Sequence, residues 1–428
     1  NPMLISCAAL REAGLVTYDD GEEFTPDDPE RVDYPAVRES KEKLLRRCFA
    51  QSEGKLQKEL AAFRRENPWV EDFALFTALK ARYGGVMWTK WPDREVRRRQ
   101  PAALERCRRE LDGEIRYHLF CQYLFFRQWF ALKRYCNGLG IRLFGDMPIY
   151  VAEDSADTWT RPEVFQLDGE GVPKRVAGVP PDFFSADGQL WGNPLYRWFS
   201  LRLHGYGWWV ERMAAMAKMY DIVRIDHFIG FANYYSVPQG APNARTGKWI
   251  IGPGKSLFRT LERKIPGLNI VAEDLGCVND RVRRLLTAVG YPGMRVLSFG
   301  FGGGEDNPHL PANYVTNSVV YTGTHDNDTV RGWIGTADDA ALAQARQLLG
   351  FDKPEDGPAA FVHAVLASRA DTAMIPMQDV LGLGGWARMN RPGTIGNNWL
   401  WRMAPGAATP ELAQRLRREN EATNRRMD

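Results

Sequence analysis

Three stretches of this chain share one feature: an apolar run suited to a buried strand ends in a carboxylate. They are residues 222–226, which end in Asp226, residues 270–274, which include Glu273 and Asp274, and residues 319–326, which end in Asp326. A strand buried on both faces of a parallel sheet reads as a continuous hydrophobic run. In an α/β barrel, ligands bind at the carboxyl ends of the strands. The sequence therefore predicts that three acids converge on one ligand site.

Apolar runs of this kind alternate with helical patterns beyond residue 137. The runs that fit strands are residues 141–144, 222–225, 270–272, 294–299, 319–322 and 372–376. Stretches that fit amphipathic helices lie at 208–220, 256–264, 280–289 and 337–349. Repeated βα units predict a parallel sheet, rolled into a barrel or doubly wound. A (β/α)8 barrel needs eight strands, so two are unaccounted for.

Residues 35–136 have a different character, because they are rich in charge and carry no strand signal. Helical stretches at 40–66, 71–83 and 114–136 end at Asn67-Pro68, Gly84-Gly85 and Asn137-Gly138. We therefore divide the chain into three parts. Residues 1–34 are a residual N-terminal barrel segment, residues 35–136 a helical insertion subdomain, and residues 137–428 the catalytic barrel with loop insertions.

Composition excludes several classes of protein. The formal charge is only +3 over 428 residues, and the cluster at residues 97–99 fits a solvated helix face better than a nucleic-acid site. No apolar window is long enough for a membrane span, and no signal peptide opens the chain. The cysteines show no CxxC and no paired spacing, which predicts reduced thiols in a cytoplasmic protein and no zinc site; they are Cys7, Cys48, Cys107, Cys121, Cys136 and Cys277. We expect no cofactor and no metal.

The acids at the strand ends suit the cleavage of a glycosidic bond with retention. This reaction uses two carboxyl groups about 5 to 5.5 Å apart, one as nucleophile and one as acid. Arg224 lies two residues before Asp226, so both side chains are predicted on one face, where the guanidinium favours an ionised nucleophile. Glu273 is the candidate acid, whose pKa must be raised by its setting. Asp326 is the candidate stabiliser of the oxocarbenium-like transition state.

Each motif also has a structural interpretation. An isolated Arg-x-Asp is usually a surface or helix-capping pair. Glu273-Asp274 can cap the next helix, with Asp274 the better candidate. Residues 325–328 can form a turn or a calcium loop. Three acids at strand ends, two of them next to histidines, are however hard to explain as helix caps that arose independently.

Beyond this chemistry, the motifs resemble a known family. Residues 224–228, 272–276 and 322–327 resemble the catalytic signatures of the 4-α-glucanotransferases, also called amylomaltases or disproportionating enzymes, which form glycoside hydrolase family 77 of the α-amylase superclan. Residues 145–151 resemble the family's third-strand motif. The loop that follows it is matched by residues 177–182 and 189–194, and the eighth-strand region by residues 378–379, 387–390 and 392–394. The resemblance implies a (β/α)8 TIM barrel of the α-amylase type with a helical insertion.

The resemblance also implies roles for single residues. Asp226 is expected to form a covalent glucosyl-enzyme, Glu273 to act as acid and then base, and Asp326 to stabilise the transition state. The acceptor is the 4-hydroxyl of another glucan or of glucose, so the partners are α-1,4-glucans such as maltooligosaccharides, amylose and glycogen. The substrate-binding set implied is Arg224, His325, Asp146, His227, Trp191, Asn193, Trp249 and Asn327.

Aromatic residues in loops are natural platforms for sugar rings. We expect Trp191 and Trp249 to lie in loops and contact glucan, whereas Trp129, Trp208 and Trp209 fit the core. Residues 238–254 resemble the family's mobile loop over the active site, which can exclude water. Family members usually carry about 60 or more residues before the point that matches Asn1, and these hold the first barrel strands, so we expect these strands to be missing here.

Three functions remain open on this basis. The first is a 4-α-glucanotransferase. The second is a retaining α-glucan hydrolase of the same superclan, in which water is the acceptor. The third is an inactive carbohydrate-binding remnant. The oligomeric state is not predicted.

Overall fold

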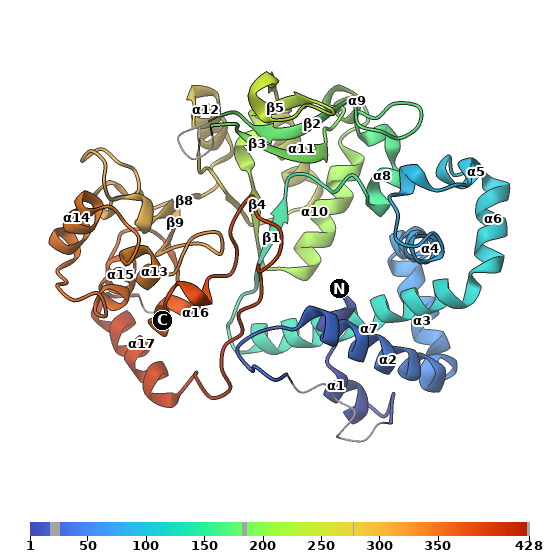
Figure 1. Ribbon diagram of the computed structural model, residues 1–428, viewed down its shortest axis with the longest axis horizontal. Helices are drawn as coiled ribbons and strands as arrows, with labels where there is room; N and C mark the ends of the chain where they lie inside the picture. The colour runs from blue at the N-terminus through green and yellow to red at the C-terminus, as the bar shows by residue number, and fades with distance from the viewer. Residues whose placement is uncertain (18–25, 182–185, 277, 426–428) are drawn as a thin grey trace. The chain divides into compact units, whose positions relative to one another are not determined.

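The computed structural model describes residues 1–17, 26–181, 186–276 and 278–425 (Figure 1). Asp182 of the predicted loop motif and Cys277 therefore lie outside the described residues. The chain forms two compact units, which we treat separately. As far as their residues are described, unit 1 comprises Asn1–Phe24, Pro35–Ile270 and Gly276–Val289, and unit 2 comprises Thr25–Tyr34, Val271–Leu275 and Gly290–Asp428.

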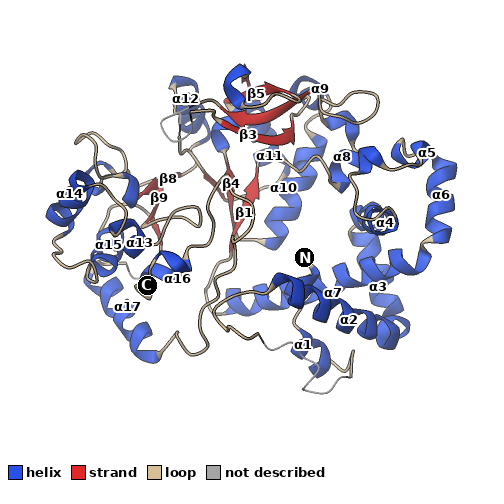
Figure 2. Ribbon diagram, in the orientation of Figure 1, coloured by secondary structure: helices blue, strands red, loops and turns tan. Residues whose placement is uncertain are grey.

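Helices make up the chain before the first strand (Figures 1 and 2). They are η1 Pro2–Leu4, α1 Cys7–Glu12, α2 Tyr34–Ser52, η3 Glu53–Leu56, α3 Gln57–Glu66, α4 Trp69–Arg82, η4 Trp88–Lys90, α5 Arg94–Arg97, α6 Pro101–Glu110 and α7 Asp112–Gly138. The single helix predicted over residues 40–66 is wrong, because a 3-10 turn separates α2 from α3. This turn contains Gly54, and glycine is among the poorest helix formers. The helices predicted over 71–83 and 114–136 are confirmed as α4 and α7.

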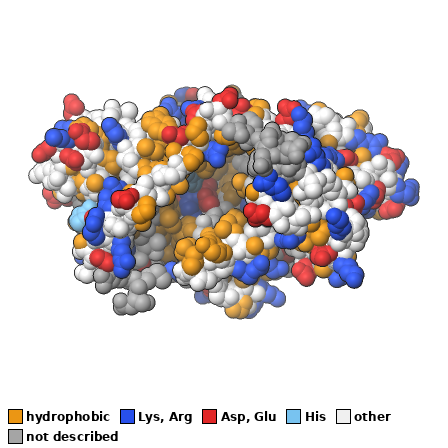
Figure 3. Space-filling model, turned by 90° about the horizontal axis from the view of Figure 1, so that it is seen from below, with side chains coloured by type: hydrophobic (Ala, Val, Ile, Leu, Met, Phe, Trp, Pro, Cys, Tyr) orange, Lys and Arg blue, Asp and Glu red, His pale blue; other side chains and the backbone are white. Residues whose placement is uncertain are grey.

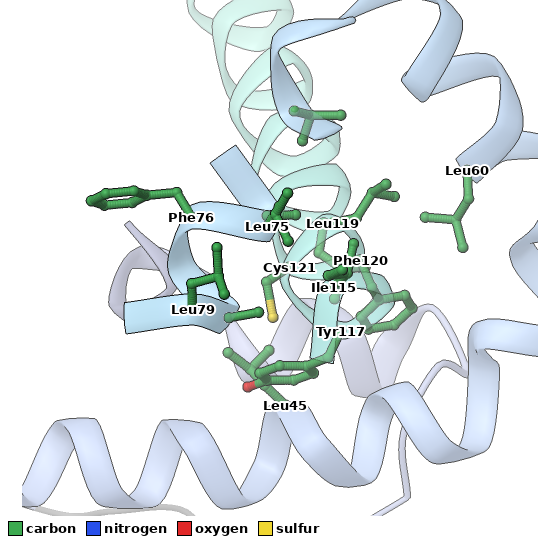
Figure 4. Close-up of a cluster of buried hydrophobic side chains, with 14 of the residues drawn as sticks. Leu45, Leu60, Leu75, Phe76, Leu79, Ile115, Tyr117, Leu119, Phe120 and Cys121 are labelled. Carbon is green, nitrogen blue, oxygen red and sulfur yellow. The ribbon is translucent and has the colours of Figure 1, made fainter. Parts of the chain in front are cut away.

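One apolar core holds these helices together (Figure 4). Leu75 and Leu79 of α4 are fully buried, as is Phe120 of α7, and Cys121 is 1 % exposed. Leu75 and Leu79 are four residues apart and so share one face of their helix. Burying each large apolar side chain stabilises the fold by about 1.5–3 kcal/mol.

The first two parallel strands lie in unit 1. They are β1, Phe144–Pro148, and β4, Ile222–Asp226, with Asp146 opposite Arg224 and Pro148 opposite Asp226. The prediction that β1 starts at Ile141 is wrong, because Ile141 is 52 % exposed and follows the turn that ends α7. The helices of this part are α8 Ala156–Thr160, η5 Pro162–Val164, α9 Trp198–Leu203, α10 Gly207–Met219, α11 Lys255–Lys264 and α12 Asp280–Val289.

Unit 1 also contains an antiparallel sheet that was not predicted. Its strands are β2 Arg175–Val179, β3 Gln189–Pro194, β5 Asn233–Pro238 and β6 Lys248–Ile251, in the order β3-β2-β5-β6, with η6 Phe228–Phe231 and η7 Ala244–Thr246 beside β5 and β6 in the sequence. The expectation that Trp191 and Trp249 lie in loops is therefore wrong, since they lie on β3 and β6. Part of the predicted lid, residues 238–254, is likewise strand β6.

The remaining parallel strands run in the order β7-β8-β9-β10. They are β7 Ile270–Ala272, β8 Gly293–Val296, β9 Ser318–Tyr321 and β10 Thr372–Met374. Strands β8, β9 and β10 belong to unit 2, whereas Ile270 of β7 is assigned to unit 1 and the rest of β7 to unit 2. The helices of unit 2 are η8 Leu297–Phe299, η9 Pro311–Asn313, α13 Val330–Ile334, α14 Asp339–Leu349, α15 Gly357–Leu366, α16 Met377–Val380, η10 Gly385–Ala387 and α17 Pro410–Ala422. Each of the six predicted strands thus has a counterpart, with ends displaced by up to four residues.

None of the helices within the described ranges is long and apolar enough to cross a membrane. Acidic and basic side chains are interspersed over the face shown in Figure 3.

Candidate active site

Arg224 of β4 joins two of the predicted site residues in unit 1. Its Nη1 donates to both carboxylate oxygens of Asp146, at 2.7 and 2.8 Å, and its Nη2 lies 2.9 Å from Oδ1 of Asp226. The side chain of Arg224 is only 8 % exposed, while those of Asp146 and Asp226 are 44 % and 43 % exposed. The prediction that Arg224 and Asp226 share one face of the strand is confirmed.

His227 follows β4 and is buried beside an aromatic ring. Its backbone is left-handed, with φ of 52°, and burial lowers the pKa of its imidazole to about 4. The Trp191 ring meets it edge to face, with centroids 4.8 Å apart. A Cβ at Gly230 would come within 3.0 Å of the His227 ring. His227 is therefore a neutral, closely packed side chain.

The two tryptophans predicted to contact glucan are partly exposed to solvent, whereas the Asn193 side chain bonds to the backbone. Trp191 is 36 % exposed and Trp249 is 42 % exposed. Trp249 packs against Tyr235 of the neighbouring strand, at 5.3 Å between centroids. The Asn193 side chain donates to the carbonyl oxygen of Val151 at 2.8 Å and so fixes the segment that follows β1.

In unit 2, Glu273 and Asp274 have different environments although they are adjacent. Both are buried, and Oε1 of Glu273 accepts the Leu275 N–H at 2.8 Å. Asp274 accepts the Met294 N–H at 2.6 Å and lies 3.2 Å from Arg295. The alternative of Asp274 as a helix cap is wrong, because Asn279 accepts the first N–H groups of α12.

Asp326 is held by residues from the C-terminal segment. Its Oδ1 accepts the Asn390 side-chain amide at 2.6 Å, and its backbone carbonyl accepts Arg388 at 2.7 Å. Nε2 of His325 lies 3.5 Å from Oδ1 of Asp326. The side chains of His325 and Asp326 are 33 % and 38 % exposed, so the pair is accessible to a ligand.

The turn that carries Asp326 is fixed at both ends. The Asn327 side chain accepts the Thr324 N–H and hydroxyl, both at 2.8 Å, so its oxygen serves the turn. Asp379 accepts the Thr322 hydroxyl at 2.6 Å and the Val330 N–H at 2.7 Å. Burial raises the pKa of Asp379. The Asn327 N–H donates to the Thr324 carbonyl at 3.1 Å, so the hydrogen-bonded turn spans residues 324–327. No acidic, histidine or cysteine cluster able to hold a metal occurs among the described residues.

The predicted residues therefore fall into two groups. Unit 1 brings Asp146, Arg224 and Asp226 together and places His227 against Trp191, while unit 2 brings His325 and Asp326 together. Three contact residues of Asp326 and His325 were assigned no role from the sequence: Arg388, Asn390 and Trp399. The motif at residues 387–390 was a usable signal for the first two. Nothing in the sequence singled out Trp399.

A family model described as 4-alpha-glucanotransferase matches residues 1–408 of the chain. The 4-alpha-glucanotransferase of Thermus thermophilus is 46 % identical over 438 residues, which cover 99 % of this chain and 86 % of that protein. The 4-alpha-glucanotransferase of Clostridium butyricum is 40 % identical, covering 98 % of this chain and 86 % of its relative.

A solved structure agrees closely with the fold. The amylomaltase from Streptococcus agalactiae in complex with acarbose superposes with a TM-score of 0.96 at 37 % identity, covering 99 % of this chain and 86 % of that one. The predicted fold class is confirmed: the chain is an α/β protein whose parallel strands match a partial (β/α) barrel. The division at residues 34 and 136 stays a prediction.

Proposed function

Because the chain belongs to the 4-alpha-glucanotransferase family, and is an enzyme of that kind, we propose that it transfers segments of α-1,4-glucans by a retaining double displacement. The observation that carries this proposal is the Arg224 guanidinium, which contacts Asp146 in the middle of β1 and Asp226 at the end of β4, the parallel strand paired with β1. A carboxylate that is pinned by a buried cation yet 43 % exposed is suited to attack a sugar carbon.

In the first step, Asp226 attacks the anomeric carbon of the donor glucan. The bond from that carbon to the glycosidic oxygen breaks, and Glu273 gives its proton to this oxygen, which leaves as the 4-hydroxyl of the released chain. Glu273 is the buried member of the three acids. Asp326, oriented by Asn390, supplies negative charge beside the cationic sugar ring of the transition state.

In the second step, an acceptor replaces the released chain. The Glu273 carboxylate takes the proton from the acceptor's 4-hydroxyl, whose oxygen attacks the anomeric carbon and displaces Asp226. The product is an α-1,4-glucan of new length. The exposed rings of Trp191 and Trp249 are proposed to stack on the sugar, because aromatic faces fit the apolar faces of pyranoses. His325 and His227 are proposed as further members of the sugar-binding set. Cytoplasmic localisation stays a prediction.

Incubation of the purified chain with maltotriose tests the proposed function. A transferase converts it into glucose and a ladder of shorter and longer maltooligosaccharides, all with α-linkages. Exclusive formation of shorter products would favour the retaining hydrolase, and the absence of any product would favour the inactive remnant. Either result would contradict the transfer proposed here.

A further inference from the structure

Trp399 has a backbone conformation that bulky residues rarely adopt. Its φ is 61°, in the left-handed region, although its side chain is large. Its N–H donates to the Met389 carbonyl at 2.6 Å, and its own carbonyl accepts the Tyr34 hydroxyl at 2.7 Å. A strained conformation that is fixed on both sides persists because its surroundings determine it, and such positions concentrate at functional sites.

A segment from the opposite end of the chain provides part of this support. Residues 30–32 pair antiparallel with residues 400–402. We call residues 30–34, which end at the first residue of α2, the strap. The Val32 N–H donates to the Leu400 carbonyl at 2.8 Å, and the Arg402 N–H donates to the Glu30 carbonyl at 2.7 Å. Arg31 and Trp401 form a β-bridge between these bonds. The strap and residues 399–402 belong to the same unit.

Residues at both ends of the loop that Trp399 closes contact His325 or Asp326. The bond from Trp399 to Met389 closes residues 389–399 at their base. On one side of this base, the Asn390 side chain donates to the Asp326 carboxylate. The Asn390 N–H donates to the His325 carbonyl at 3.0 Å. From the other side, the Trp399 indole lies against the His325 imidazole, with centroids 5.3 Å apart and planes inclined by 35°.

We propose that Trp399 is a positioning residue of the transfer reaction, which fixes the His325 imidazole beside the Asp326 carboxylate, and that Tyr34 of the strap holds Trp399 in place. The inference rests on the proposed function of His325 and Asp326. It assigns the strap a part in catalysis although no residue of the strap is itself a candidate catalytic group. Since Trp399 is 44 % exposed, truncating it removes little of the apolar core.

The test compares three variants with two matched controls. Trp399→Ala removes the indole, Trp399→Phe keeps an aromatic ring, and Tyr34→Phe removes one hydroxyl. Trp386→Ala is the control for the first, because Trp386 is an exposed tryptophan of the same C-terminal region, and Tyr135→Phe is the control for the third, because Tyr135 is 68 % exposed. Each variant is assayed for maltotriose disproportionation and for its thermal unfolding midpoint.

We expect Trp399→Ala to lower kcat about tenfold, because a misoriented group costs mainly the chemical step, and to change KM by less than about threefold. Trp399→Phe should restore most of kcat, and Tyr34→Phe should lower it by a smaller factor. Both controls should match the unaltered protein. An unchanged kcat in Trp399→Ala would overturn the proposal. The proposal would also be overturned if Trp399→Phe lost as much activity as Trp399→Ala and both variants unfolded at a lower temperature than the unaltered protein.

A second measurement does not depend on activity. The chain has six histidines, so the imidazole resonances of isotope-labelled protein can be assigned with a His325→Gln variant. Removing the indole or the Tyr34 hydroxyl should shift the His325 resonances, and the controls should leave them unmoved. Unmoved resonances in Trp399→Ala would overturn the positioning role. If the unaltered chain fails to disproportionate maltotriose, the proposed function fails, while these spectra still decide whether Trp399 positions His325.

Discussion

Arg224 shows how a single side chain organises one group of the candidate residues. A planar guanidinium can contact two carboxylates at once, which a lysine ammonium does less well. Its burial leaves both acids in a fixed geometry while their outer edges face solvent. The group therefore combines a structural ion pair with an accessible carboxylate, Asp226, which we propose as the nucleophile.

Replacing Asp226 by Asn should abolish transfer without unfolding the chain. The amide keeps the shape of the carboxylate but cannot form the glycosyl ester, so we expect kcat with maltotriose to fall on the order of 10³-fold or more. Asp352→Asn is the control, since Asp352 is exposed on unit 2. Near-normal turnover of the Asp226 variant, with contaminating enzyme excluded, would refute the assignment of the nucleophile.

Replacing Glu273 by Gln should separate the two steps. The variant lacks the acid, so turnover of maltotriose should fall by about 10²- to 10⁴-fold. An α-glucosyl fluoride needs no proton for its leaving group, so the first step should survive and release a burst of one fluoride per active enzyme. Equal loss of the first step with both donors would show that Glu273 is not the acid.

At the scale of elements, β3 carries Trp191 and depends on a glycine in β2. A Cβ at Gly178 would lie 2.4 Å from the carbonyl oxygen of Gln189 in β3, where the pairing register shifts. Gly178→Ala should therefore displace β3, destabilise unit 1 by about 1–3 kcal/mol and raise KM.

Gly113→Ala is the control for this prediction, because Gly113 lies in α7 and a Cβ there meets nothing within 4 Å. This change should leave stability unchanged or raise it by up to about 1 kcal/mol. Denaturant unfolding and maltotriose kinetics measure both variants. If Gly178→Ala is as stable and active as the control, the close approach of β2 and β3 does not support the site.

The parallel strands were predictable from the sequence, because residues such as Val223, Val271 and Val320 form short runs buried on every side. The antiparallel strands were not. β5 contains Asn233 and Ser236, which are buried but polar, so its hydrophobic signal is weak. The contacts of Asp326 with Asn390 and of Trp399 with Tyr34 join distant residues, and local patterns carry no information on them.

At the scale of the whole molecule, each unit contains a histidine that burial keeps neutral. The pKa of His227 in unit 1 and the pKa of His309 in unit 2 are both lowered to about 4, in each case chiefly by burial. In the unfolded chain an imidazole titrates near pH 6.5. The unfolded state therefore binds more protons between about pH 6.5 and 4, and stability should fall as the pH falls through this window.

At pH 5, each of these histidines should lower the free energy of unfolding by on the order of 1–2 kcal/mol relative to pH 7.5. His309→Asn keeps an acceptor for the Val296 N–H, which His309 Nδ1 accepts at 3.1 Å, and should lose less stability over this range. His204→Gln, at an exposed position, should not alter the pH dependence. Unfolding midpoints at the two pH values measure both. If the unfolding midpoint depended on pH identically in the unaltered protein, His309→Asn and His204→Gln, this account would be contradicted.

Trapping the proposed covalent intermediate on Asp226 is the most direct test of the mechanism. A 5-fluoro-α-glucosyl fluoride forms the glycosyl ester quickly and releases it slowly, so the adduct can be located by mass spectrometry of a proteolytic digest. The double displacement predicts one fluoroglucosyl group on the peptide that contains Asp226, and none in the Asp226→Asn variant. An adduct on another carboxylate, or none in a chain that disproportionates maltotriose and is inactivated by the reagent, would contradict it.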